Sequence, residues 1–273
     1  MAKETVDISM SKDQKPYGTF DDSSMERDTK QGFLKQCLVG NDNCMTILRQ
    51  CGCEFIGLLL FVLIGSLSAV GVGDSPVLHV ATAHGFTIAL LIMAMGHISG
   101  GHFNPAVTFG LMLNGTAPIL ISLFYWLAQL LGSLLGGFFV FAVLVPEKYN
   151  AIQGGAIAVD IIKNGDFKCF VSELLLTFAL VYVVFMTAVH RDDNVLAPLA
   201  IGLTVFVDIL AGATISGASM NPARSFGPLV MYSMAGQCNS SNATTPCIKA
   251  LWRTHYLHWI GPLAGGALAA LIY

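Results

Sequence analysis

The stretch that decides the fold occurs twice: "SGGHFNPAVTFG" begins at Ser99 and "SGASMNPARSFG" begins at Ser216. Both copies contain Ser-Gly-x-x-x-Asn-Pro-Ala, and the second has Arg224 where the first has Val107. Asparagine is a preferred helix N-cap, and proline suits the first helical position because its missing N–H would have no partner there. Each copy therefore predicts the start of a helix, at Asn104-Pro105-Ala106 and at Asn221-Pro222-Ala223.

Composition places most of the chain in a membrane. Charged residues make up 11% and hydrophobic residues 54% of the 273 residues, whereas soluble domains carry about 25% charge. Many charges lie in residues 1–35, and long stretches after Glu54 carry almost none. The net charge of −3, without a basic stripe, excludes a nucleic-acid partner. We therefore expect a multi-span protein surrounded by the lipid bilayer.

The N-terminal segment differs from the rest. Its first thirty residues contain no apolar core, so they are not a signal peptide, and their composition is typical of disorder. We expect residues 1–48 to form a disordered cytoplasmic tail and residues 49–273 to form one membrane domain. Within that domain the sequence indicates two repeats, at about 50–145 and about 168–273.

Apolar segments near the length that crosses a bilayer, about 20 residues, occur six times. We expect these spans at about 54–72, 80–98, 118–142, 169–189, 195–213 and 255–273. The apolar segments that begin at the two Asn-Pro-Ala boxes are about half as long as a span, which is typical of re-entrant pieces. Backbone of this kind survives at membrane depth only when it is buried in protein or lines a wet cavity.

The repeat extends beyond the two boxes. Glu54 precedes Asn104 by 50 positions, and Glu173 precedes Asn221 by 48. A glycine-spaced aromatic segment follows each box, "YWLAQLLGSLLGG" and then "LHWIGPLAGGALAA". Each half therefore has three spans and one half-helix, and because three is odd the second half is inverted in the membrane. In such inverted repeats the functional site lies between the halves, near the midplane.

Positive charge predicts the orientation. The cytoplasmic side of a membrane protein carries the excess of Lys and Arg. On one side of the predicted spans lie Lys3, Lys12, Lys15, Arg27, Lys30, Lys35, Arg49 and Arg191, and on the other Lys148, Lys163, Lys168, Lys249 and Arg253. The first group is larger, so we expect a cytoplasmic N-terminus.

The two half-helices enter from opposite faces, so their N-termini meet near the middle of the bilayer. Each carries about half a positive elementary charge, which repels a dehydrated cation but not a neutral molecule. The side-chain amides of Asn104 and Asn221 are expected to donate to passing water, which would turn its protons outward and interrupt a proton wire. One Asn-Pro-Ala box is compatible with an ordinary turn, but two in equivalent settings favour this interpretation.

Three charged residues lie in segments predicted at membrane depth, where a charge without partners is costly. Arg224 opposes the dipole of its own helix and is costly at this depth, so we expect it to bind loop carbonyls and to present donors to a pore. Glu54 and Glu173 each lie on the side of one re-entrant loop. A buried carboxylate needs hydrogen-bond donors, and the loops offer free N–H groups. We expect both glutamates to support the loops, with proton coupling as the alternative.

Other polar residues have less specific expectations. His97 and His102 flank the first loop and are expected to pack against it or bond to it, with a cytoplasmic pH sensor as the alternative. Metal binding there would need more ligands, so neither a metal nor a cofactor is expected. Asp208 is costly if charged in the membrane, and we expect it to bond loop backbone or His84.

The boxes, the paired glutamates, "GHISGGH" and "NPARSFGP" resemble the aquaporin (major intrinsic protein) family, from about Cys51 to Tyr273. The resemblance implies an all-α right-handed bundle of six transmembrane helices and two re-entrant half-helices, assembled as a homotetramer with one pore per subunit. It also implies an outer selectivity filter at four positions: His84, Ile209, Ala218 and Arg224. We therefore expect a channel for water and small neutral solutes, and not an enzyme.

The filter residues suggest which solutes pass. The pair His84 and Ile209 resembles the aquaporin-8 type, associated with water, ammonia and hydrogen peroxide, and also some plant vacuolar members; "VDILAG" favours the first. Ala218 departs from the glycine common in the family. The filter lacks the aromatic wedge usual for glycerol, and Ser225 stands where glycerol-conducting members usually have aspartate. The alternatives are a glycerol-type facilitator, a secondary transporter and a structural membrane protein.

The segment "CNSSNATTPC" is expected on the outer side. Asn239 and Asn242 head N-glycosylation sequons, and Cys238 and Cys247 bracket them and are candidates for a disulfide in an oxidising compartment. The alternative is a plain polar loop with two free thiols. Asn114 also heads a sequon, but on the predicted cytoplasmic side. The expected location is the plasma membrane, with an intracellular membrane as the alternative.

Overall fold

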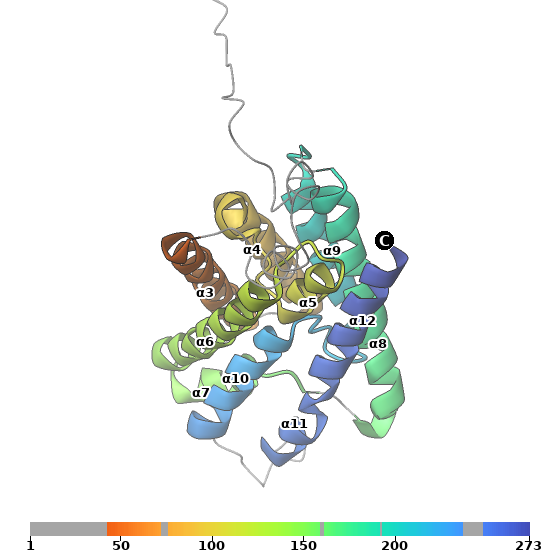
Figure 1. Cartoon of the computed structure of the whole chain (residues 1–273). Helices are drawn as coiled ribbons and strands as arrows, with labels where there is room; N and C mark the ends of the chain where they lie inside the picture. Colours follow the sequence, from red (N-terminus) through yellow and green to blue (C-terminus); the bar gives the residue numbers. More distant parts are fainter. Residues whose placement is uncertain (1–42, 72–75, 159–160, 192, 237–247) are drawn as a thin grey trace, which may run out of the picture.

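The computed structural model describes residues 43–71, 76–158, 161–191, 193–236 and 248–273. The regular structure in these residues is helical (Figure 1). The first repeat contains α3 (Cys44–Leu67), α4 (Pro76–Ser99), the half-helix α5 (Pro105–Leu113) and α6 (Ile119–Val143). The second contains α8 (Ile161–Val184), α9 (Ala197–Gly212), the half-helix α10 (Pro222–Ala235) and α12 (Leu257–Ile272).

Short elements join these helices. The connection between the repeats contains α7 (Pro146–Ala151) and the 3₁₀ turn η1 (Gln153–Gly155). The helix α8 continues into a π-helical turn, η2 (Phe185–Val189), and α11 (Ile248–His255) precedes α12. The predicted fold class is confirmed: in the described residues, six longer helices and two half-helices form an all-helical bundle.

The helix boundaries differ from the predicted spans at several places. The first helix begins at Cys44 rather than near residue 54, because the Asn43 side chain caps it by accepting a hydrogen bond from Thr46 N at 2.9 Å. Four described helical segments are long and apolar enough to cross a membrane, at 44–67, 76–99, 119–143 and 165–189. The fifth span, α9, has only 16 residues, and the sixth is divided at Tyr256 between α11 and α12.

The two repeats pack alike and exchange their half-helices. In the first repeat α3 packs on α6, and in the second α8 packs on α12, while α4 and α9 join the repeats (Figure 1). Each half-helix lies against the third long helix of the other repeat: α10 packs on α6, and α5 packs on α12. This exchange holds the N-terminus of each half-helix in the interior of the bundle.

Glycine allows a close approach between the repeats. A methyl group on Gly85 would lie 2.7 Å from Gly202 O, and one on Gly202 would lie 2.5 Å from Gly85 O. Small residues at such crossings let membrane helices approach backbone to backbone. The reciprocal contact between α4 and α9 is what an inverted repeat requires, since each glycine occupies the equivalent place in its own half.

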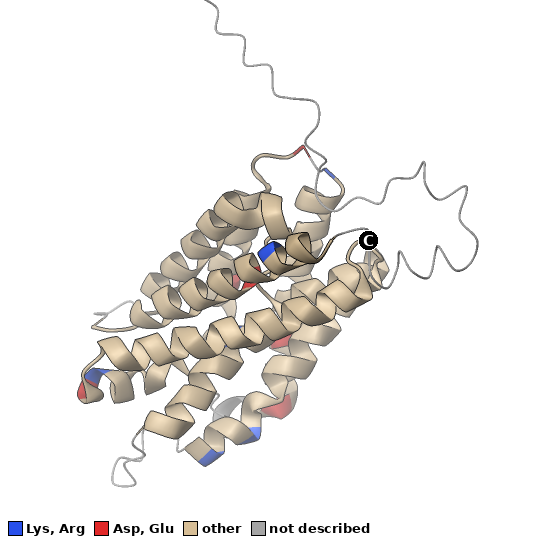
Figure 2. Ribbon diagram, turned by 60° about the vertical axis from the view of Figure 1, so that its left-hand side comes forward, with Lys and Arg blue, Asp and Glu red and all other residues tan. Residues whose placement is uncertain are grey.

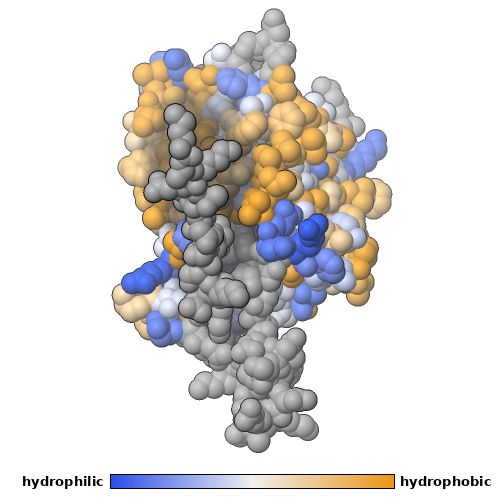
Figure 3. All heavy atoms as spheres, turned by 90° about the horizontal axis from the view of Figure 1, so that it is seen from above, coloured by the Kyte–Doolittle hydropathy of each residue, from blue (hydrophilic) through white to orange (hydrophobic). Residues whose placement is uncertain are grey.

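Side-chain polarity separates the ends of the bundle from its flanks. Lysine, arginine, aspartate and glutamate lie mainly towards the two ends, apart from a few in the interior (Figure 2). Large apolar side chains cover much of the visible flank (Figure 3), and exposed ones include Leu90, Leu127, Leu175 and Leu203. Exposed apolar surface of this extent is typical of contact with lipid or another subunit. The chain is therefore an integral multi-pass membrane protein.

Candidate functional site

The loops that precede the half-helices adopt the same backbone conformation. Three positions in each loop have positive φ: Gly100 (86°), Gly101 (64°) and Phe103 (43°) in the first, and Gly217 (87°), Ala218 (46°) and Met220 (51°) in the second. Residues other than glycine are strained there, at a cost of about 1–3 kcal/mol each. Such strain persists only where surrounding contacts hold the backbone in place, and it is concentrated at functional sites.

Each half-helix is capped by the asparagine of its own box. Asn104 Oδ1 accepts from Ala106 N at 2.8 Å, and Asn221 Oδ1 accepts from both Ala223 N and Arg224 N at 3.1 Å. These bonds satisfy N–H groups that have no partner within the helix. The helices begin at Pro105 and Pro222, so the sequence located the starts of both half-helices.

The same two asparagines join the loops to each other. Asn104 Nδ2 donates to Met220 O, and Asn221 Nδ2 donates to Phe103 O, both at 2.8 Å. The opposite loop therefore uses one of the two hydrogens of each amide, a contact that was not predicted from the sequence. The bonds bring the positive ends of two helix dipoles together, deep inside the protein.

A buried glutamate holds the first loop. Glu54 is fully buried, and its carboxylate accepts from His102 N at 3.0 Å and from Phe103 N at 2.6 Å. Ser99 Oγ and Gln129 Nε2 also donate to it, each at 2.8 Å. Four donors from three elements thus surround this carboxylate.

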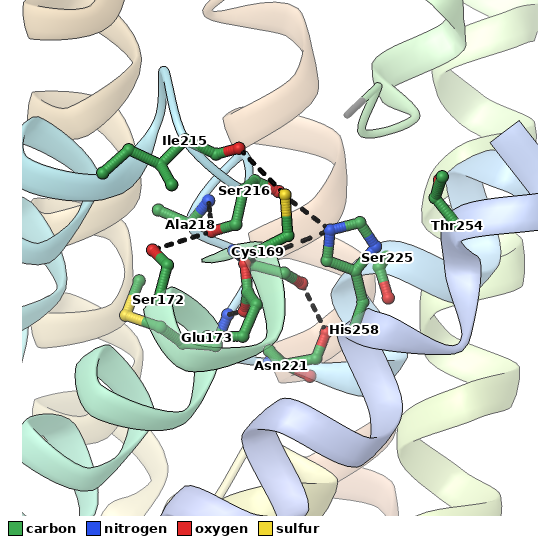
Figure 4. A network of polar contacts seen from close by, with 12 residues as sticks. Cys169, Ser172, Glu173, Ile215, Ser216, Ala218, Asn221, Ser225, Thr254 and His258 are labelled. Atoms are coloured by element: carbon green, nitrogen blue, oxygen red, sulfur yellow. Dashed lines mark hydrogen bonds and ion pairs between the residues drawn. The ribbon is translucent and has the colours of Figure 1, made fainter. Parts of the chain in front are cut away.

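Glu173 holds the second loop in the equivalent way. It is fully buried, and it accepts from Ser219 N at 2.9 Å and from Met220 N at 2.8 Å. Its Oε1 also lies 4.0 Å from His258 Nε2 on α12 (Figure 4). The fully buried position of both glutamates, each bonded to backbone N–H groups, is what a loop support requires.

The four residues assigned to the filter line one cavity, here called the outer cavity. His84 comes from α4, Ile209 from α9, Ala218 from the second loop and Arg224 from the first turn of α10. The other lining residues are Phe61, Pro76, Val77, Val80, Val205, Ala213, Gly217, Ser219 and Met220. Residues more than a hundred positions apart in the chain therefore meet in one place.

The imidazole of His84 has a defined orientation. Its Nδ1 lies 2.9 Å from Val80 O, and because a carbonyl only accepts, Nδ1 carries the hydrogen. In the neutral ring Nε2 is then an acceptor, and it is buried without a partner among the described residues. Phe61 packs edge-on against this ring, with centroids 5.2 Å apart. None of the four residues assigned to the filter is Phe, Tyr or Trp, but α3 supplies the ring of Phe61 to the same cavity.

Arg224 forms a hydrogen bond to the segment that connects the two repeats. Its Nη1 donates to Gly155 O at 3.0 Å. Gln153, Gly154 and Gly155 all have positive φ, so this short turn presents its carbonyl in a conformation that suits glycine. The bond is of the kind expected for Arg224, although the sequence did not indicate which carbonyl would accept it.

The remaining predicted residues lie in different settings. His102 contacts Thr108 Oγ1 through Nδ1 at 3.1 Å, whereas His97 is exposed at the end of α4 and has no loop-supporting contact among the described residues. Asp208 is buried, but its Oδ2 has no hydrogen-bond partner in the described chain. No cluster of three potential metal ligands occurs in the part of the chain that the structure describes. Cys238, Asn239, Asn242 and Cys247 lie outside the described residues.

Four residues of the site were not predicted from the sequence: Phe61, Phe103, Gly155 and Met220. Phe61 lies on α3 two turns after Glu54, and that helical spacing was the available signal. Met220 and Phe103 occupy the same place before the asparagine in their boxes, and this repetition marked their carbonyls as a pair. No local pattern identified Gly155, because its contact with Arg224 spans 69 positions.

The fold and the site define a class: a membrane channel in which two re-entrant helices meet at their N-termini beside a cavity. The family model for the major intrinsic proteins matches residues 43–273. The chain belongs to this family, the aquaporins, whose members are channels that conduct water and are not enzymes.

Relatives of known sequence agree with this assignment. The chain is 41% identical to aquaporin TIP2-1 of Arabidopsis thaliana, over 83% of this chain and 86% of that one. It is 37% identical to aquaporin-8 of Mus musculus, over 82% of this chain and 80% of that one. The X-ray structure of the aquaglyceroporin from Plasmodium falciparum superposes with a TM-score of 0.68 at 18% identity, covering 83% of this chain and 95% of that one. At that identity the structural likeness supports the fold alone.

The carboxylate of Glu173 gives a direct test of loop support. In Glu173→Ala, the N–H groups of Ser219 and Met220 lose their partner while buried, which costs about 1–3 kcal/mol each. We expect a clearly lower thermal unfolding midpoint in detergent and reduced water flux in proteoliposomes. Glu147→Ala on α7, where the side chain is exposed, is the control. An unchanged midpoint for Glu173→Ala would contradict the supporting role.

Proposed function

We propose that the protein is a passive channel for water, ammonia and hydrogen peroxide, with one pore in each subunit of a homotetramer. The observation that carries the proposal is the meeting of two capped helix N-termini, joined through Asn104 and Asn221, beside the outer cavity. Neutral molecules of this size need donors, acceptors and a matching diameter, but no compensation for a charge.

Electrostatics supports the exclusion of ions and protons. Each half-helix contributes about half a positive elementary charge at its N-terminus, and Arg224 adds a full charge at the outer cavity. A cation that has lost water therefore meets two successive barriers. The free amide hydrogens of Asn104 and Asn221 orient passing water by its oxygen, so a hydrogen-bonded chain of water cannot carry a proton through.

The outer cavity supports selection of ammonia together with water. Ile209 presents no hydrogen-bonding group, so a molecule that passes it gives up hydrogen bonds at this point. The cost is smaller for a molecule that forms weaker hydrogen bonds. His84 Nε2 is an acceptor when Nδ1 bonds Val80 O, and Arg224 is a donor. Ammonia, like water, can use one group of each kind, and hydrogen peroxide is also small enough to do so.

Assembly and orientation belong to the same proposal. The exposed apolar flank is compatible with lipid on one side and neighbouring subunits on the other. We place the N-terminus in the cytoplasm and the protein in the plasma membrane, with an intracellular membrane as the alternative. Glycerol is the alternative solute, since Phe61 supplies an aromatic face to the outer cavity.

The proposed channel should conduct water without a proton leak. Purified protein in liposomes should accelerate osmotic shrinkage well above that of empty vesicles. A pH-sensitive dye in the same vesicles should report no added proton flux, because the helix dipoles and Asn amides interrupt the proton wire. Saturable, ion-dependent uptake would favour a transporter, and a proton current would contradict the electrostatic argument.

Selectivity should depend on Ile209. Adding a donor there in Ile209→His should lower ammonia flux about fivefold, as one hydrogen bond of about 1 kcal/mol allows, while water flux changes much less. His84→Ala should admit larger solutes such as urea, since it removes a bulky wall. Stopped-flow measurement of ammonia, urea and water on matched vesicles checks both. Equal losses of ammonia and water flux in Ile209→His would show that this position is not the filter.

Glycosylation reports the orientation. Expression in a eukaryotic membrane should modify Asn239 or Asn242, and Asn239→Gln with Asn242→Gln should remove the mobility shift given by glycosidase. Asn114, at the end of α5, should stay unmodified because it faces the cytoplasm. A sugar on Asn114 would reverse the proposed orientation.

A further inference from the structure

In each repeat, one buried side chain of the third long helix forms a hydrogen bond to the re-entrant loop of the same repeat. Tyr125 on α6 donates its hydroxyl to Ser99 O at 2.8 Å. His258 on α12 has its Nε2 2.9 Å from Ser216 O. Ser99 and Ser216 begin the two copies of the repeated motif, so the two carbonyls are equivalent.

Tyr125 and His258 are also equivalent in the helices that carry them. Each directly precedes a tryptophan. Each also lies seven positions before a glycine against which the neighbouring helix packs: a methyl group on Gly132 would overlap Phe55 O, and one on Gly265 would overlap Leu174 O. A phenol in one repeat and an imidazole in the other therefore perform the same contact.

The second repeat gives this side chain an additional contact. In the first repeat, Gln129 follows Tyr125 by four positions and donates to Glu54 Oε2 at 2.8 Å. The equivalent position after His258 is Pro262, which has no side-chain donor. His258 Nε2 itself lies 4.0 Å from Glu173 Oε1. One histidine thus faces both the loop carbonyl and the loop-supporting carboxylate, a task divided between two residues in the first repeat.

The segment that His258 contacts carries part of the outer cavity. Ser216 Oγ accepts from Ala218 N at 3.3 Å and donates to Ser172 Oγ at 3.2 Å, and Cys169 Sγ donates to Ile215 O at 3.3 Å (Figure 4). The chain then runs through Ala218 to the second Asn-Pro-Ala box, which Arg224 directly follows. The position of this loop therefore determines the position of both filter residues.

The contact with His258 is buried and directional. His258 is 1% exposed, so water cannot replace its hydrogen bond at low cost. The carbonyl of Ser216 only accepts, so Nε2 carries a hydrogen. Ala218, two positions further, has a φ of 46°, and such a strained backbone keeps its conformation only while neighbouring contacts enforce it.

We propose that His258 is a positioning residue for the outer filter. By donating to Ser216 O beside Glu173, it holds the loop in the conformation that sets Ala218 and Arg224 in the outer cavity, and it thereby sets solute selectivity. This inference rests on the proposed channel function.

The test compares three variants as folded channels in liposomes. His258→Phe keeps a ring but removes the donor, and we expect the ratio of urea to water permeability to rise about fivefold, the effect of one lost hydrogen bond. His258→Tyr restores a hydroxyl donor, the group that Tyr125 uses for Ser99 O, and should return the ratio to within about twofold of wild type. Tyr125→Phe is the matched control. It loosens the first loop, which carries no filter residue, so water flux can fall but the ratio should not change.

Each result decides the proposal. It is overturned if His258→Phe keeps the wild-type ratio, if His258→Tyr shifts the ratio as much as His258→Phe, or if Tyr125→Phe shifts it equally. If His258→Phe does not give a monodisperse protein by size exclusion, His258→Tyr decides alone: a wild-type ratio supports the proposal and an altered ratio overturns it. Water and ammonia flux through the wild-type protein tests the proposed function separately.

Discussion

The structure depends on bringing two helix N-termini together inside the protein. Each end carries about half a positive charge, so the two repel, and the loops that lead to them expose backbone N–H and C=O groups. The reciprocal bonds from Asn104 Nδ2 to Met220 O and from Asn221 Nδ2 to Phe103 O join these ends directly. The exchange of half-helices, with α10 on α6 and α5 on α12, keeps them aligned.

The carboxylates of Glu54 and Glu173 complete this arrangement. Each binds two consecutive backbone N–H groups just before a half-helix, and negative charge there offsets the positive helix ends. The two supports are not identical. Glu54 receives additional bonds from Ser99 and Gln129, whereas Glu173 has His258 at 4.0 Å. The carboxylate of Glu54 thus accepts hydrogen bonds from two side chains besides the loop N–H groups, whereas Glu173 has one histidine nearby.

Much of this could be predicted because it follows from local chemistry. The Asn-Pro-Ala boxes predicted the half-helix starts, since capping involves residues two or three positions apart. The pairing of glutamates with boxes predicted buried carboxylates beside the loops. Three of the misses involved features that the repetition did not mark. The aromatic face of Phe61, the exposure of His97 and the carbonyl of Gly155 depend on how helices rotate and where connections cross.

The sequence by itself determined the number of spans, the short re-entrant segments, the inverted repeat and the family. These follow from apolar length, from capping and from an odd number of spans per half. Only the tertiary structure decided which atoms of those residues meet. It gave one amide hydrogen of each asparagine to the opposite loop and set His258 against Ser216. Hydrogen bonds depend on distance and direction in space, and residues more than forty positions apart acquire these only when the helices pack.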